Sequence, residues 1–242
     1  MATMLKAVLL DFNGVVINDE AIHEELIDEI VLSENLRPLS LAEHHQFCLG
    51  KSDRVCLRQI FEHRSRGITE DYLNRLIQRK AQLYRAKLAN LETLPIYEGV
   101  RGFLEQIQLR QLPIALVTGA IRSEVINILE QSDLLSFFTT IVAGDDIQTS
   151  KPDPDGYLLA VEKLNQALPA LALTGANCLA VEDTLVGMQA AKAAGIPVVG
   201  IAHTYPYHFM QRHANWAIDD FSQLDLDRVT VVFARRQQAS RI

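Results

Sequence analysis

Five short apolar runs, each about as long as a buried strand, constrain how this chain can fold. They span residues 6–10, 113–117, 140–142, 178–181 and 197–201, and none shows a regular alternation of polar and apolar residues. Runs of this kind suit strands that are buried on both faces of a parallel sheet. Helical stretches separate the last four runs, so we predict βαβ units and an α/β fold with a doubly wound, Rossmann-like parallel sheet.

A long helical segment interrupts this alternation between the first run and the second. Between residues 19 and 90, apolar residues recur at helical spacing, as at Ile22, Leu26 and Ile30. Polar breaks divide the segment into about four helices, and Pro95 marks its end. We therefore predict an all-helical inserted domain of residues 18–92 in an α/β core of residues 1–17 and 93–242.

Composition excludes several classes of partner. The 242 residues are 48% hydrophobic and 22% charged, as in ordinary globular domains. A formal net charge of −7 argues against a nucleic acid or an anionic membrane as the main partner, because both require a positive surface. No apolar run approaches the roughly 18 residues of a membrane span, and residues 1–13 lack a secretion signal pattern. We expect a cytoplasmic protein without nucleic-acid or membrane partners and, by default, a monomer.

The cysteines and most histidines show no metal-ligand spacing. Cys48, Cys56 and Cys178 form no Cys-x-x-Cys pair, so we expect reduced thiols rather than a disulfide framework or a zinc site. Six histidines also lack ligand spacing, and we expect them on the surface: His44, His45, His63, His203, His208 and His213.

Polar side chains suited to phosphoryl chemistry follow four of the predicted strands. In a parallel sheet the carboxyl ends of the strands meet at one edge, so we expect these side chains to lie together. They supply a nucleophilic carboxylate, a hydroxyl, a cation and a carboxylate pair, which are the groups that phosphoryl transfer needs. In chain order they are Asp11 with Asn13, Thr118 with Gly119, Lys151, and Glu182 with Asp183.

Four motifs in chain order resemble the haloacid dehalogenase (HAD) superfamily. They are Asp11-Phe12-Asn13-Gly14-Val15, Val117-Thr118-Gly119, Ser150-Lys151-Pro152 and Val181-Glu182-Asp183-Thr184-Leu185-Val186-Gly187. The resemblance covers essentially the whole chain. Within the superfamily, the sequence is similar to the branch that contains β-phosphoglucomutase and small-molecule phosphatases, which insert a helical cap after the first strand. The resemblance implies a Mg²⁺-dependent phosphohydrolase that acts on a phosphorylated small metabolite.

The resemblance also implies roles at the phosphoryl group. Asp11 would attack phosphorus and become an aspartyl-phosphate. Thr118 and the Gly119 amide would donate hydrogen bonds to the phosphoryl oxygens, with Ala120 beside them. Lys151 would neutralise charge and keep Asp11 ionised.

By the same resemblance, four residues would form the metal site. Asp183, the Asp11 carboxylate and the Asn13 backbone carbonyl would hold Mg²⁺, with Glu182 assisting directly or through water. Magnesium favours such a set, because it binds few carboxylates and keeps several waters.

The cap would supply the residues that read the substrate. The family places its substrate-reading loop where Lys51 and Ser52 lie, with Arg54 as a weaker candidate, and His23 matches a position near the cap hinge. The stretch from Lys51 to Val55 also faintly resembles the segment of phosphonoacetaldehyde hydrolases that carries a Schiff-base lysine. Those relatives have a small residue in place of Asn13 and an arginine in place of Lys151, yet phosphonatase-like chemistry stays open.

Asn13 departs from the family pattern, which has an aspartate there that protonates the leaving oxygen and activates water. An amide cannot shuttle a proton, and general acid–base help is worth about 10²- to 10⁴-fold in rate. Four explanations remain open. The leaving group is acidic; Asp19, Glu20 or His23 supplies the proton; the chain is a phosphometabolite-binding relative; or Asn13, which precedes Gly14, deamidates to aspartate. A phosphomutase is a further alternative, because it shares the aspartyl-phosphate step.

Overall fold

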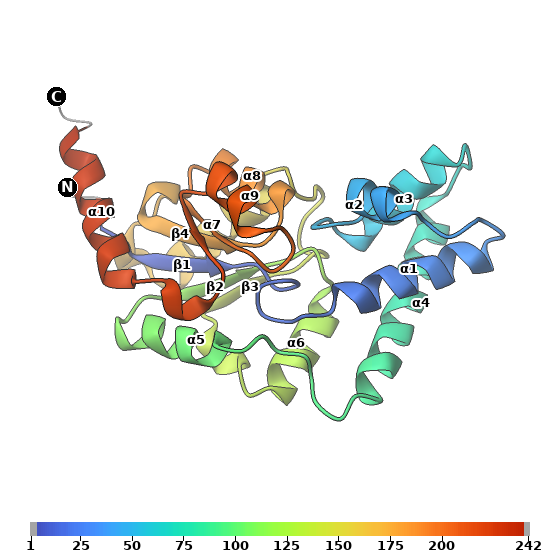
Figure 1. Cartoon of the computed structure of the whole chain (residues 1–242), viewed down its shortest axis with the longest axis horizontal. Coiled ribbons are helices and arrows are strands. Elements are labelled where there is room, and N and C mark those ends of the chain that lie inside the picture. The colour runs from blue at the N-terminus through green and yellow to red at the C-terminus, as the bar shows by residue number, and fades with distance from the viewer. Residues whose placement is uncertain (1–3, 240–242) are drawn as a thin grey trace.

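A six-stranded parallel sheet forms the centre of the molecule (Figure 1). The computed structural model describes residues 4–239, with side chains through residue 234. The strand order is β3-β2-β1-β4-β5-β6, so the chain leaves β1 in both directions, as in a doubly wound fold. The strands are β1 (Ala7–Leu10), β2 (Ile114–Val117), β3 (Thr140–Val142), β4 (Cys178–Glu182), β5 (Val198–Ile201) and β6 (Trp216–Ile218).

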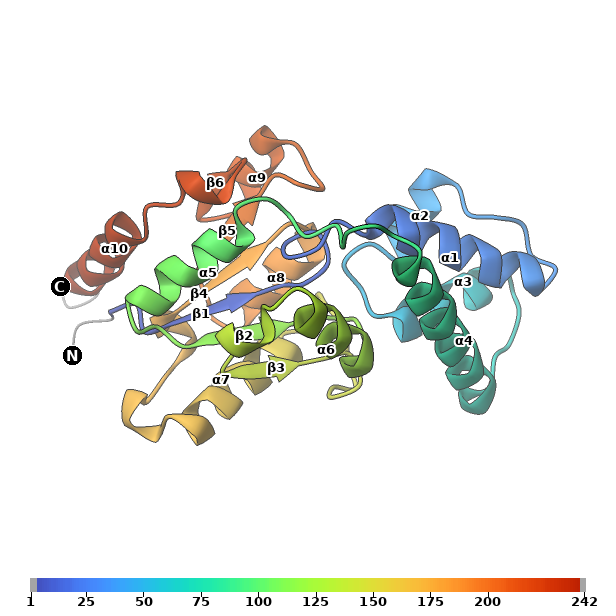
Figure 2. The ribbon, with the colours of Figure 1, turned by 90° about the horizontal axis from the view of Figure 1, so that it is seen from below.

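Two apolar cores cover the two faces of the sheet, because successive strand side chains point to opposite faces. Val8 and Leu10 belong to the core that α5 (Val100–Leu109), α6 (Arg122–Gln131) and α10 (Leu226–Ala239) share. Ala7 and Leu9 belong to the core shared with α7 (Asp155–Ala167), α8 (Leu185–Ala193) and α9 (Tyr207–His213). Figure 2 shows α5 and α6 in front of the sheet. The predicted Rossmann-like α/β core is confirmed.

Five of the six strands coincide with the predicted apolar runs, and β6 was missed. β6 has only three residues, and Trp216 and Ala217 are only half-buried, so it leaves no buried-strand pattern in the sequence. Short 3₁₀ helices at Leu135–Phe137, Pro169–Leu171, Gly175–Asn177 and Phe221–Gln223 complete the described core.

Four helices lie between β1 and α5, as predicted: α1 (Glu20–Ser33), α2 (Leu41–Phe47), α3 (Asp53–His63) and α4 (Glu70–Ala89). We call residues 20–89 the helical unit. It has an apolar core of its own, built from residues such as Ile30, Leu57 and Leu73. Ser40 and Glu43 cap α2 reciprocally. Within residues 4–239, no helix is both long and apolar enough to cross a bilayer.

Two neighbouring segments connect the helical unit to the core. The Asn18 amide donates to the Pro95 carbonyl over 2.8 Å, and the Tyr97 amide donates to the Val16 carbonyl over 3.0 Å. The two connecting segments are therefore paired with each other, and the helical unit lies beyond the carboxyl ends of the strands (Figure 1). The domain boundaries at residues 18 and 92 stay a prediction.

The expectation of three reduced cysteines is wrong for two of them. Cys48, directly after α2, and Cys56, in α3, form a disulfide, whereas Cys178 is a buried free thiol. The turn between the helices brings the two Cα atoms to 4.4 Å, which is within the range that a disulfide spans. Their spacing matches no sequence motif, so only the packing of α2 on α3 reveals the pair.

Gly144 is predicted to be required for the close approach of its backbone to the Gly119 carbonyl. A Cβ atom there would lie 2.2 Å from the Gly119 carbonyl oxygen, and backbone cannot retreat cheaply. We expect Gly144→Ala to lower the free energy of unfolding by about 1–3 kcal/mol, measured by urea denaturation. The control is Gly102→Ala in α5, where a Cβ would meet nothing within 4 Å. That change should stabilise the protein by about 0.5–1 kcal/mol, and equal effects of the two changes would contradict the close approach.

Candidate active site

Lys151 links two buried carboxylates at the carboxyl ends of the strands. Its Nζ lies 2.8 Å from Asp11 Oδ2 and 2.7 Å from Glu182 Oε1. Burial alone would lower the pKa of Lys151, but the Asp11 and Glu182 charges outweigh burial and raise that pKa. The lysine therefore remains an ammonium ion at neutral pH.

The sheet brings these groups together because β1 and β4 are neighbours. Asp11 directly follows β1, and its amide donates to the Val181 carbonyl of β4 over 3.1 Å. Glu182 ends β4, and Asp183 follows it. Thr184 then caps α8 by accepting the Gly187 amide, so a helix begins directly behind the acidic pair.

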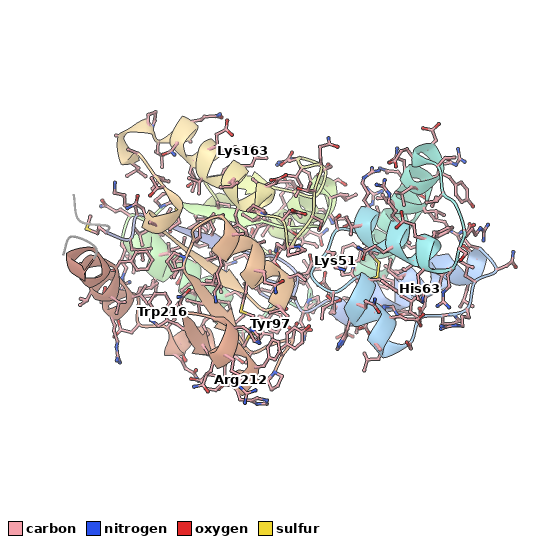
Figure 3. The ribbon with its side chains drawn as sticks, turned by 90° about the horizontal axis from the view of Figure 1, so that it is seen from above. Lys51, His63, Tyr97, Lys163, Arg212 and Trp216 are labelled. Atoms are coloured by element: carbon pink, nitrogen blue, oxygen red, sulfur yellow. A yellow bond between two sulfur atoms is a disulfide. The ribbon has the colours of Figure 1, made fainter. Side chains whose placement is uncertain are left out.

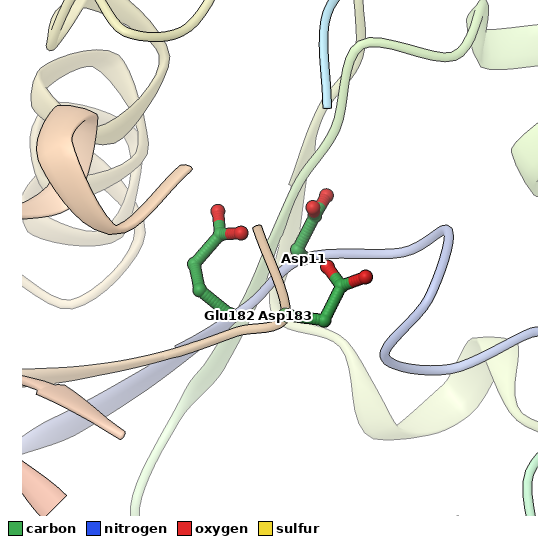
Figure 4. A group of neighbouring side chains, drawn as sticks. All are labelled: Asp11, Glu182 and Asp183. Carbon is green, nitrogen blue, oxygen red and sulfur yellow. The ribbon is translucent and has the colours of Figure 1, made fainter. Parts of the chain in front are cut away.

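Asp11, Glu182 and Asp183 form a cluster that fits a divalent cation (Figure 4). Each offers a carboxylate oxygen, and these oxygens all lie within 4.8 Å of one another. Burial, followed by the Asp11 charge, raises the pKa of Glu182 to about 7 and the pKa of Asp183 well above its usual range. Asp183 Oδ1 is buried and has no hydrogen-bond partner in the described part of the chain. A hard cation with oxygen ligands would satisfy that oxygen and relieve the repulsion.

Gly14 leaves room for the acidic cluster. Its φ is +75°, and a Cβ there would lie 1.9 Å from Asp183 Oδ2. The Gly14 carbonyl accepts a hydrogen bond from His203 Nδ1 over 2.7 Å, and Thr204 donates to Asp183 Oδ2. The His203 ring also stacks on the Tyr97 ring, with 3.7 Å between the ring centroids. No pattern in the sequence signals these supporting contacts, and the prediction that His203 lies on the surface is wrong because the residue is half-buried against the site.

The Thr118 hydroxyl is engaged within the protein. It accepts the Ala120 amide over 3.0 Å and donates to Asn13 Oδ1 over 3.4 Å. Gly119 approaches the backbone of the loop after α2 so closely that a Cβ would lie 2.9 Å from the Ser52 amide nitrogen. The predicted phosphate loop is thus in contact with the helical unit.

The loop with Lys51 and Ser52 lies where the helical unit meets the core (Figure 3). The Ser52 amide donates to Ser150 Oγ over 2.9 Å, next to Lys151. Lys51 Nζ donates to the Gln46 carbonyl over 2.6 Å and to Gln59 Oε1 over 3.0 Å, and burial lowers the pKa of Lys51.

Arg54 points elsewhere. Its guanidinium pairs with Glu70 at 2.9 Å and donates to Asn74 on the exposed face of α3 and α4. It lies outside the lining of the cavity above Asp11, so its suggested contact with substrate is not supported.

Asn13 joins a network with Asp19 and His23. Its amide nitrogen lies 3.1 Å from Asp19 Oδ1 and 2.9 Å from Asp19 Oδ2, and it donates to that carboxylate. His23 Nε2 lies 3.1 Å from both Asp19 Oδ2 and Asn13 Nδ2. Asp19 is 1% exposed; burial would raise its pKa, but His23, Tyr84 and Asn13 outweigh burial and lower it.

Lys80 fixes the other side of His23. Its Nζ is fully buried and lies 2.6 Å from both His23 Nδ1 and Asp53 Oδ1. Because an ammonium ion can only donate, His23 Nδ1 accepts and His23 Nε2 carries the proton toward Asp19. The Tyr84 ring stacks on the His23 ring, with 4.7 Å between the ring centroids, and the Tyr84 hydroxyl donates a hydrogen bond to Asp19. Lys80 and Tyr84 were missed because their positions in α4 look like ordinary helix positions.

One cavity collects most of these groups, and we call it the central cavity. Of the predicted site residues it includes Asp11, Asn13, His23, Lys51, Gly119, Ala120, Lys151 and Asp183. Thr118, Ser52 and Glu182 are buried behind its walls. Its other lining residues are Glu20, Glu24, Ile27, His44, Cys48, Gly50, Asp53, Cys56 and Thr184. His44 was expected on the surface but is 6% exposed, because it lies on the face of α2 that meets α1 at Asp28.

The parallel sheet and the acidic cluster at its carboxyl edge define a Rossmann-like α/β core with its site at the topological switch point. The profile of the family described as haloacid dehalogenase-like hydrolase matches residues 8–201. The chain belongs to this family.

Individual relatives include phosphatases. The chain is 28% identical over 202 residues to the phosphorylated carbohydrates phosphatase of Thermotoga maritima, covering 83% of this chain and 87% of that protein. It is 32% identical over 133 residues to the phosphoglycolate phosphatase of Escherichia coli, covering 55% of this chain and 50% of that relative. The crystal structure of β-phosphoglucomutase from Clostridium difficile superimposes with a TM-score of 0.82 at 19% identity, covering 96% of this chain and 99% of that one.

Magnesium should stabilise the fold through the acidic cluster. A ligand that binds only the folded state adds about 2.7 kcal/mol at 100 times its Kd, so thermal unfolding should shift upward with MgCl₂. Asp183→Asn should abolish the shift, whereas Asp71→Asn, on the exposed face of α4, should preserve it. A shift that survives Asp183→Asn would place the metal elsewhere.

Glu124 should make stability depend on pH. It lies at the start of α6 and is 2% exposed, and neither carboxylate oxygen has a hydrogen-bond partner among the described residues. Burial raises the pKa of Glu124 from 4.5 to about 7. The folded state therefore holds this proton to a higher pH than the unfolded state, and stability is lost as pH rises from about 4.5 through 7.

Glu124→Gln removes this titration. Relative to wild type, the variant should gain up to about 3 kcal/mol of stability between pH 5 and pH 8 in urea denaturation. Glu130→Gln, exposed on the same helix, should show no such gain. Parallel pH profiles for wild type and Glu124→Gln would refute the assignment.

Proposed function

We propose that this protein is a Mg²⁺-dependent phosphohydrolase that acts on a phosphorylated small metabolite through Asp11. The observation that carries the proposal is the placement of Asp11 in the central cavity, held by Lys151 and beside the acidic pair of β4. The phosphatases among the relatives support the reaction class.

In the proposed reaction, an Asp11 oxygen attacks phosphorus while the bond from phosphorus to the leaving oxygen breaks. Water then attacks the aspartyl-phosphate and releases inorganic phosphate, restoring Asp11. Lys151 offsets the negative charge on the phosphoryl oxygens, and the Gly119 loop contributes backbone donors. Asp11, Asp183 and the Asn13 carbonyl, with Glu182, would hold Mg²⁺, which supplies charge stabilisation when bound.

We further propose that residues 18–92 act as a cap on a core of residues 1–17 and 93–242. The contacts of Ser52 with Ser150 and of Gly119 with the loop after α2 support a closed arrangement that excludes water. A monomeric state and a cytoplasmic location stay predictions.

The proton for the leaving oxygen requires a source other than the Asn13 amide. Of the three groups that the sequence suggested, Glu20 and His23 line the central cavity, whereas Asp19 is buried behind them. The Asn13 amide donates to both oxygens of Asp19, so an aspartate at residue 13 would bring two carboxylates together. This contact weighs against deamidation as the normal route to activity.

A phosphonatase-like hydrolase is the second candidate. Lys51 lines the central cavity, and burial lowers its pKa, as a Schiff-base lysine requires. Trapping with borohydride and phosphonoacetaldehyde should label Lys51 if this chemistry operates, and absence of label would remove the candidate.

The main proposal is tested by phosphate release from sugar, acyl and enol phosphates with Mg²⁺. Asp11→Asn should abolish release because it removes the nucleophile, and Asp71→Asn should leave release unchanged. Asn13→Asp should change the pH profile, because residues 13 and 19 would then share a proton. A wild type that releases no phosphate from any ester, or release that survives in Asp11→Asn, would sink the proposal.

A further inference from the structure

One face of α1 forms a wall of the central cavity. Glu20, His23, Glu24 and Ile27 line the cavity, at the spacing of residues that share a helix face. α1 begins beside the carboxyl ends of the strands and runs away from the sheet (Figure 1). His23 contacts Asn13, so Glu24 and Ile27 lie progressively farther from Asp11, by roughly 1.5 Å per residue along the axis. This wall faces the part of a substrate that is remote from the phosphoryl group.

The wall offers hydrogen-bond acceptors. The carboxylates of Glu20 and Glu24 make no hydrogen bond or ion pair with any other described residue. His44 also lines the cavity, and its Nε2 lies 3.2 Å from Asp28 Oδ1 on the next turn of α1. Because His44 Nε2 donates its hydrogen bond to Asp28, the neutral ring presents a lone pair at Nδ1, and that buried atom has no partner in the described chain.

Cationic donors are scarce at the same wall. No arginine is among the described residues that line the central cavity. Asp53 is neutralised by Lys80, and two of the three Lys51 donors are used by Gln46 and Gln59. Lys151 serves Asp11 and Glu182 at the phosphoryl end. The remote wall therefore presents the Glu24 carboxylate and lacks the forked donor that carboxylate or phosphate groups select.

From these contacts we infer that the protein selects phosphate esters whose remote part bears hydroxyl or ammonium donors and no carboxylate or second phosphate. Glu24 is the specificity-determining residue, with the His44 Nδ1 atom as a further acceptor. The inference rests on the proposed function, because it assumes that the phosphoryl group lies at Asp11. Phosphoglycolate, which carries a carboxylate, would meet like charge at Glu24.

Binding to Asp11→Asn protein with Mg²⁺ tests the inference without turnover. Calorimetry compares O-phosphoethanolamine, glycerol 3-phosphate and 2-phosphoglycolate, and the two donor-bearing esters should bind at least about tenfold tighter than phosphoglycolate. If phosphoethanolamine binds most tightly, the site selects an ammonium group. If glycerol 3-phosphate binds most tightly, the site selects hydroxyl groups. Equal or tighter binding of phosphoglycolate, or no binding of any ester, overturns the inference.

Two substitutions assign the selection to Glu24. Glu24→Gln should reduce the preference for phosphoethanolamine over phosphoglycolate several-fold, and Glu24→Lys should reverse it. Glu29→Gln, exposed on the same helix, is the matched control and should leave the preference unchanged. Unaltered preference in both Glu24 variants would refute the assignment, whatever their stability.

Turnover separates this inference from the proposed function. Wild-type hydrolysis of all three esters at similar kcat/KM would leave the phosphohydrolase proposal intact and overturn the selectivity. Selective binding without hydrolysis would support the inferred selectivity and contradict the proposal that the protein is a phosphohydrolase.

Discussion

The buried ion pairs of Lys151 are the constraint on which the site depends. Three acidic side chains at one sheet edge would repel one another if all were ionised, and burial strengthens that repulsion. Lys151 compensates two of them, at 2.8 Å and 2.7 Å, while Asp183 keeps an oxygen without a partner. The remaining imbalance is one that a divalent cation would correct, so the acidic cluster and the lysine belong to one electrostatic unit.

The sequence predicted the parts of the fold that depend on local pattern. Runs such as Ala7–Leu10 and Val198–Ile201 are apolar throughout because both faces of the sheet are covered. The grouping of Asp11, Lys151 and Asp183 was also predictable, because each follows a strand of one parallel sheet. β6 and the Cys48–Cys56 disulfide were not, since β6 is short and half-exposed and the disulfide depends on how α2 packs against α3.

Contacts between the helical unit and the core were the least predictable. Lys80 and Glu124 stand in amphipathic helices at positions that read as ordinary surface or interface residues, yet both are buried. Lys80 is buried within the helical unit, against His23 of α1 and Asp53 of α3, whereas Glu124 belongs to α6 of the core. The charges acting on Glu124 come mainly from that unit, from Lys80 and Asp53 first.

Asn13 is best understood together with Asp19. The amide at residue 13 donates to both carboxylate oxygens of Asp19, and His23 and Tyr84 supply the remaining donors. An aspartate in its place would force two carboxylates about 3 Å apart to share one proton, since they could not both ionise. The negative charge that the family pattern puts at residue 13 is therefore carried by Asp19, which does not line the central cavity. Removing the Asn13 amide would take away one of the three donors to the buried Asp19 carboxylate and leave only His23 and Tyr84 to satisfy it.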